Sequence, residues 1–130
     1  MIVVGGVPRV TIDVSKNGVY LFLGEGAIGK IYLAEALSSY QEYGFYVVTY
    51  LNGKVDSFGD IDSANIIMFD RLDLYVSEDI STIIYKYSKE KVILVDLKNL
   101  EMLNTLFKGC NWGFVDIELS GDSNIFVRSM

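Results

Sequence analysis

Apolar and polar positions along the chain divide into short strand-like runs and longer segments with helical spacing. Residues Arg9 to Ser15 alternate, with Val10 and Ile12 on one face, which predicts a half-buried strand. Lys16-Asn17-Gly18 contains the Asn-Gly pair typical of tight hairpins, so Val19 to Leu23 is predicted to pair back antiparallel. This second run is nearly all apolar, as expected for a strand buried on both faces.

Three segments have helical character. Apolar residues recur at helical spacing from Lys30 to Tyr43, and Gly44 is a natural residue to end that helix. Ser77 is a candidate N-cap for a second helix, whose buried stripe would comprise Ile80, Ile83, Ile84 and Tyr87. A third, short helix is predicted over Leu100 to Phe107, closed by Gly109.

Further apolar runs complete an alternating β/α pattern. Strands are predicted within Phe45 to Leu51, at Ile66 to Phe69 and at Val92 to Val95, while Lys54 to Ser63 reads as a loop with at most a short element. Gly113 to Leu119 and Ile125 to Arg128 are predicted to form a terminal hairpin. The pattern predicts an α/β fold in one domain, residues 1–130. The expected architecture is a three-layer sandwich, a mainly parallel sheet flanked by helices, with antiparallel hairpins at both ends of the chain.

Composition narrows the function classes. The formal net charge of −6 argues against direct nucleic-acid binding, which needs a basic surface. Because there is no histidine, Ser-His-Asp and Cys-His catalysis and most zinc sites are excluded. A single cysteine, Cys110, fits a reducing, cytoplasmic location, and we expect no signal peptide and no membrane-spanning segment.

The candidate chemistry lies in the octet Gly24-Glu25-Gly26-Ala27-Ile28-Gly29-Lys30-Ile31. Gly24, Gly29 and Lys30 match the core of a Walker A phosphate-binding loop, and Gly24, Gly26 and Gly29 match the dinucleotide fingerprint. The Walker A interpretation is favoured over the dinucleotide one. A dinucleotide site needs an acid just after the strand that follows the glycine loop, here the strand within Phe45 to Leu51, and no acid follows that strand before Asp56. A glycine-rich turn that binds nothing is the competing interpretation.

The octet, with Tyr32 to Leu37 after it, resembles the start of P-loop NTPases. Ile66 to Asp70 resembles a Walker B strand. Val92 to Asp96 resembles the strand that lies between the Walker A and Walker B strands in the additional-strand group of that superfamily. The resemblance implies a P-loop NTPase-like fold, ATP or GTP as the ligand, and Asp70 as a metal ligand.

Two departures weaken the implied activity. The family places Ser or Thr after the lysine to bind Mg²⁺, but this chain has Ile31, and Arg71 replaces the acid expected after Asp70. Asp73 could substitute for that acid only from a loop. Phosphoryl transfer depends on the metal and on positioned groups, so poor hydrolysis and doubtful Mg²⁺ binding are expected.

The predicted function is therefore a non-hydrolysing, P-loop-like module that regulates or binds a protein partner, or associates with itself. Residual nucleotide or phosphate binding is assigned to one set of residues: Gly24, Gly26, Ala27, Ile28, Gly29, Lys30 and Ile31. A weak or partner-completed ATPase and a Rossmann-type dinucleotide-binding domain are the alternatives. The many tyrosines would suit a protein interface.

Overall fold

The structure, a computed structural model, describes residues 2–4, 9–14, 16–22, 27–39, 44–51, 61–98, 108–120 and 124–130. Two α-helices occur in these ranges, α1 (Ala27–Ser39) and α2 (Glu78–Ser88), with two 3₁₀ turns, η3 (Ile61–Ser63) and η4 (Leu72–Leu74). The strands are β1 (Ile2–Val4), β2 (Arg9–Asp13), β3 (Gly18–Phe22), β4 (Phe45–Val48), β5 (Ile66–Phe69), β6 (Val92–Val95), β7 (Trp112–Ser120) and β8 (Asn124–Ser129).

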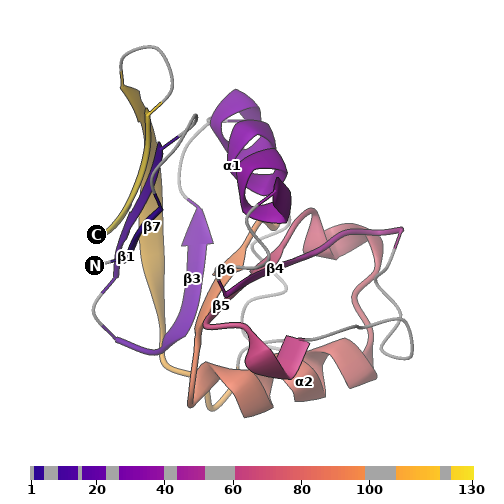
Figure 1. The fold of residues 1–130 in the computed structure, drawn as a ribbon. Coiled ribbons are helices and arrows are strands. Elements are labelled where there is room, and N and C mark those ends of the chain that lie inside the picture. Colours follow the sequence, from indigo (N-terminus) through magenta and orange to yellow (C-terminus); the bar gives the residue numbers. More distant parts are fainter. Residues whose placement is uncertain are drawn as a thin grey trace.

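All eight strands belong to one mixed sheet, in the order β1-β2-β8-β7-β3-β6-β5-β4. The five strands from β7 to β4 run parallel to one another. Beyond them β8 is antiparallel to β7, β2 is parallel to β8, and β1 is antiparallel to β2. The sheet curls, so that β1, β2 and β8 form a wall beside α1 (Figure 1).

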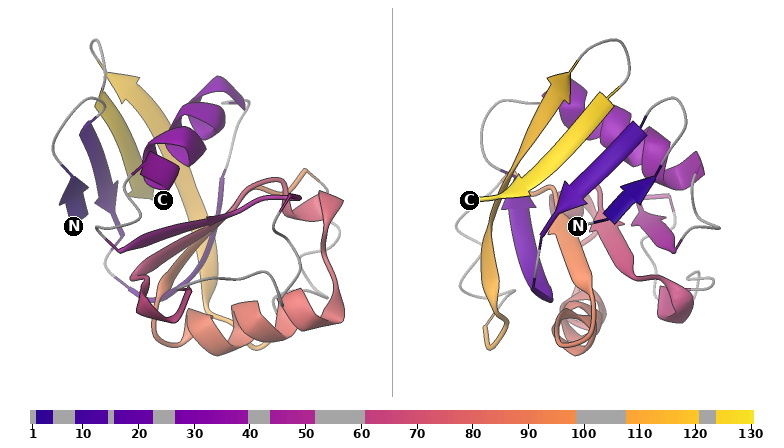
Figure 2. Two further views of the ribbon diagram at one scale, coloured as in Figure 1. Left: turned by 45° about the vertical axis from the view of Figure 1, so that its right-hand side comes forward. Right: turned by 60° about the vertical axis from the view of Figure 1, so that its left-hand side comes forward.

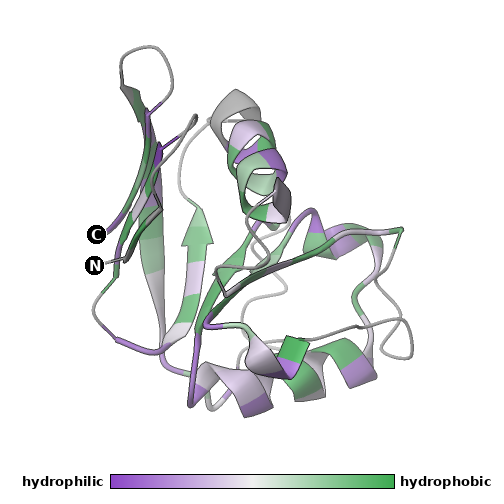
Figure 3. Ribbon diagram, viewed as in Figure 1, coloured by the Kyte–Doolittle hydropathy of each residue, from purple (hydrophilic) through white to green (hydrophobic). Residues whose placement is uncertain are grey.

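The two helices lie on opposite faces of this sheet. The connection through α1 carries the chain from β3 out to the edge strand β4, and the one through α2 carries it back from β5 to β6. Because strand crossovers are right-handed in nearly all proteins, opposite directions of travel place the helices on opposite faces. Leu33 and Leu37 of α1 pack in the curl with side chains from β2 to β8, whereas Ile80 and Ile84 of α2 pack with side chains from β3, β4, β5 and β6. Figure 3 shows apolar residues along the central strands and on both helices.

The expected three-layer, helix-flanked sandwich with a mainly parallel sheet is wrong. The sheet is curled and mixed, and no described helix covers the outer face of β1, β2 and β8, which lies open in the right-hand view of Figure 2. The side chains explain this difference: Arg9, Asp13 and Arg128 point outward from strands whose alternate residues fill the core. A strand that is apolar on one face needs a helix on that face only. The outer face instead carries a shallow hollow lined by Val3, Arg9, Thr11, Asn124 and Phe126.

The predicted hairpin between residues 9–15 and 19–23 is also wrong. β2 pairs with β1 and β8, whereas β3 pairs in parallel with β6 and β7. Gly18 serves close approach rather than a tight turn, since a Cβ there would lie 2.6 Å from the carbonyl oxygen of Asn111, and its φ is +147°. Its amide donates to the carbonyl of Lys91, which ties this segment to the amino end of β6.

Other local predictions are confirmed. The β7–β8 hairpin is present, and Ser77 accepts a hydrogen bond from the amide of Ile80 as the N-cap of α2. β6 lies between β3 and β5 in the sheet. The helix expected over residues 100–107 lies outside the described residues, as do residues 54–60 of the loop expected over Lys54 to Ser63.

Candidate functional site

The carboxyl end of the parallel strands is the part of this fold where a ligand site is expected. Open α/β sheets bind ligands beyond the carboxyl ends of their strands, where neighbouring strands are followed by connections running in opposite directions. Here β3 is followed by a connection toward β4, whereas the chain after β6 returns past β3 to β7. The switch point therefore lies between the carboxyl ends of β3 and β6.

Lys30 and Asp96 meet at this switch point. Lys30 is in the first turn of α1, directly downstream of β3, and Asp96 is the first residue after β6. The Lys30 Nζ lies 3.1 Å from Asp96 Oδ1, and the two side chains are 17% and 7% exposed. The first turn of α1 contains a lysine and no acid, which opposes the helix dipole, so the carboxylate of Asp96 compensates from the neighbouring strand.

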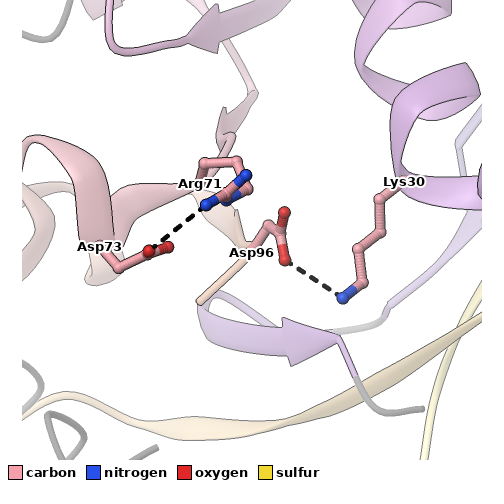
Figure 4. Close-up of polar contacts among 4 residues, drawn as sticks. All are labelled: Lys30, Arg71, Asp73 and Asp96. Atoms are coloured by element: carbon pink, nitrogen blue, oxygen red, sulfur yellow. Dashed lines mark ion pairs between the residues drawn. The ribbon is translucent and has the colours of Figure 1, made fainter. Parts of the chain in front are cut away.

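Three more charged residues continue from this pair along the edge. Asp70 follows β5, and Arg71 and Asp73 come directly after it, with Arg71 Nη2 3.7 Å from Asp73 Oδ2. Figure 4 shows that Asp96 lies between the Arg71 and Lys30 side chains, so that acid and base alternate from Asp73 to Lys30. We call these four residues with Asp70 the charged row.

The backbone around Arg71 is strained and firmly held. Arg71 has φ 50° and ψ 54°, a left-handed conformation that costs a non-glycine residue roughly 1–2 kcal/mol. The amide of Asp70 donates to the Val48 carbonyl at 2.8 Å, and the amide of Leu72 donates to the Asp96 carbonyl at 2.9 Å. These bonds join the ends of β4, β5 and β6, so the segment that carries Asp70 and Arg71 is fixed against the strand that carries Asp96.

Burial changes the proton affinity of two groups in this region. The pKa of Asp70 is raised, first by burial and then by the charge of Asp96, while Arg71 and Lys30 act in the opposite direction. Burial likewise raises the pKa of the Tyr75 hydroxyl far above its usual value, with further contributions from the acids of the charged row. Tyr75 therefore stays neutral, and its hydroxyl donates to the Val48 carbonyl at 3.0 Å.

The structure places the predicted site residues unevenly. Gly24 and Gly26 lie outside the described residues. The backbone of Ala27, Ile28 and Gly29 is already helical, so α1 begins three residues before Lys30. Lys30 reaches the carboxyl edge, whereas the Ile31 side chain is 56% exposed.

The arrangement supplies cations and acids but no compact metal cluster. Within the described ranges, no three cysteine, aspartate or glutamate side chains converge closely enough to hold a metal ion. Arg71 Nε and Asp73 Oδ1 are buried and make no hydrogen bond with the described residues. In those same ranges, no helix is long and apolar enough to cross a membrane.

Sequence reasoning missed two contributors to the site. Asp96 was not predicted to be a site residue, although it directly follows a buried strand and such a position favours a partner for Lys30 at the end of β3. Tyr75 gave no such signal, because it reaches the edge only through the turn η4. Comparison with known protein families, with characterised proteins and with solved structures finds no match, so the function must be argued from this geometry.

Proposed function

We propose that this chain is a cytoplasmic, non-hydrolysing phosphate-binding module, in which Lys30 is the cation that receives a phosphate or nucleotide. The observation that carries the proposal is the position of Lys30. It lies in the first turn of a helix, and its side chain reaches the switch point of a parallel sheet.

Three features at this point favour an anion. The first amides of a helix lack partners within the helix, and the helix dipole adds partial positive charge there. Lys30 adds a full charge beside them, on a flexible side chain that can turn toward a ligand. The order β3-β6-β5 agrees with the strand arrangement implied by the resemblance to P-loop proteins, which supports Lys30 as the counterpart of their phosphate-binding lysine.

Hydrolysis is disfavoured by side-chain chemistry. Ile31 has no oxygen to bind Mg²⁺, and Arg71 stands in left-handed backbone where an acid would orient the attacking water. Phosphoryl transfer requires both the metal and a positioned nucleophile. A module that binds phosphate and acts on a partner fits these residues better than an enzyme does.

The partner would dock on exposed apolar residues near this edge. Ile31 and Tyr32 on α1 and Tyr50 and Leu51 after β4 are each more than half exposed. Aromatic residues are enriched in the cores of protein interfaces. Both segments adjoin the carboxyl edge, so a partner bound there would be sensitive to whether the site is occupied.

A partner-completed ATPase is the second candidate, and Asp70 is the observation that favours it. Its carboxyl group interacts with the charges of both Lys30 and Asp96, which supports Asp70 as the residue that would hold a metal ion beside a bound phosphate. A neighbouring subunit would then have to supply the groups that Ile31 and Arg71 do not.

Calorimetry tests these proposals. We expect ATP, GTP or ADP to bind with similar affinity with and without Mg²⁺, and NAD to bind no better than they do. Lys30→Gln should weaken binding about tenfold, whereas Lys98→Gln, which removes the same charge from an exposed position, should change it less than about twofold. A strict Mg²⁺ requirement would favour the ATPase alternative, and no binding of any of the four ligands would refute phosphate binding.

A further inference from the structure

The charge of Lys30 is already neutralised within the protein. Asp96 is held rigidly, because its amide donates to the Phe69 carbonyl at 3.0 Å and its own carbonyl accepts from Leu72. These bonds fix the backbone of Asp96 at the end of β6, and the longer lysine side chain reaches its carboxylate (Figure 4).

We infer that the Lys30–Asp96 ion pair is an autoinhibitory lock on the anion site. The inference rests on the proposed function, since it concerns the same lysine. An incoming phosphate must compete with Asp96 for Lys30, and the Asp96 carboxylate also repels it. While this ion pair is intact, the charge of Lys30 is neutralised by Asp96 and is not available to a phosphate.

The rest of the charged row strengthens this effect. Arg71, the other cation, pairs with Asp73, so each base in the row faces an acid. Asp70 adds a further carboxylate close enough to interact with both partners of the lock. The free site is thus poorly attractive to anions, although it contains a lysine and an arginine.

Asp96→Asn opens the lock with little other change. Asparagine keeps the size of the side chain and both backbone hydrogen bonds of residue 96, while it removes the charge that holds Lys30. Asp73→Asn is the matched control, because it removes the same charge from the same row and leaves Lys30 paired. The probes are inorganic pyrophosphate and ATP, each titrated by calorimetry in EDTA at about 0.15 M salt, where charges beyond roughly 8 Å are screened.

We expect Asp96→Asn to tighten binding of both probes about tenfold or more, and Asp73→Asn to tighten it about twofold at most. Equal tightening in both variants would overturn the lock and leave a general effect of charge. Unchanged affinity in Asp96→Asn, with clear binding by the unmodified protein, would overturn the lock and leave the proposed function intact. No binding by the unmodified protein or by either variant would overturn both.

A second measurement requires no phosphate ligand. Lysine acetylation by an activated ester, followed residue by residue with mass spectrometry, reports how freely Lys30 is presented. Asp96→Asn should raise the labelling rate of Lys30 severalfold relative to Lys98, and Asp73→Asn should not. Equal Lys30 labelling in all three proteins would overturn the lock, whatever the calorimetry shows.

Discussion

Replacing Lys30 by methionine should destabilise the fold more than replacing its partner Asp96 by asparagine. The two atoms lie 3.1 Å apart, and unit charges at that distance attract by about 5 kcal/mol at an effective dielectric constant of about 20. Desolvation cancels much of this attraction in the intact protein. The cost of each variant therefore depends mainly on the charge that it leaves behind.

The two partners differ in that respect. Lys30→Met leaves the carboxylate of Asp96, 7% exposed, beside Asp70 and without its counter-charge. Removing one partner of a buried pair typically costs about 3–5 kcal/mol, and we expect about 3 kcal/mol here because the lysine is partly solvated. Asp96→Asn leaves a lysine that is 17% exposed on a long stem, so its charge can reach water at a cost of about 1 kcal/mol.

Urea unfolding followed by circular dichroism measures both values, and the double variant completes the cycle. The double variant should lose about 2 kcal/mol, half the sum of the single losses, which corresponds to a coupling energy of about 2 kcal/mol. A coupling energy near zero would show that the pair behaves as an ordinary surface ion pair. A larger loss in Asp96→Asn than in Lys30→Met would refute the assignment of Asp96 as the more deeply buried partner.

Three further predictions concern the elements around the site. Ser77→Ala should lower the free energy of unfolding by about 1 kcal/mol, because it removes the N-cap of α2. Ser81→Ala is the control: the Ser81 hydroxyl donates to the Ser77 carbonyl one turn earlier, and its loss should change the free energy of unfolding by less than about 0.5 kcal/mol. Gly44→Ala should lower the free energy of unfolding, measured with heat or urea, by about 1–2 kcal/mol, because the residue has left-handed backbone and its new Cβ would lie 2.8 Å from Asn65. Gly113→Ala, whose Cβ would make ordinary contacts at 3.6 Å, should be nearly neutral, and equal losses in the two variants would contradict this explanation. The raised pKa of Asp70 means that its contribution to stability is fully present below the unfolded value of 3.8 and is lost as pH rises through the folded value. Asp70→Asn should therefore have the higher urea midpoint at pH 7, with the difference shrinking on acidification; a lower midpoint at pH 7 would contradict the direction of the shift.

Signals that act over a few residues predicted much of the fold. Ser77 before an acidic first turn and the all-apolar β6 each identified its element correctly. Strand partners were predicted less well. Asn17-Gly18 has the sequence of a hairpin turn, but Gly18 is required by its close approach to Asn111, a contact that no local pattern records.

The candidate site shows the same division. The glycine-rich octet identified Lys30 as a group at the start of a helix, and the end of β5 identified Asp70. The partnership of Lys30 with Asp96 depends on β6 lying next to β3, a relation between distant segments of the chain that no local pattern records. The left-handed backbone of Arg71 could not be predicted from the sequence. Hydrogen bonds from the residues on either side of it, to the ends of β4 and β6, hold that segment in place.

The pairing of β2 with β8 has a consequence for how the chain acquires its structure. β2 and β8 lie far apart along the sequence, and register pairs such as Val10 with Ile125 join them in parallel. During synthesis β2 is made well before β8, so it must wait for β8 before it can join the sheet. Closing such long loops is entropically slow, so the wall beside α1 should be the last part of the molecule to form and the first to come apart when β8 is removed.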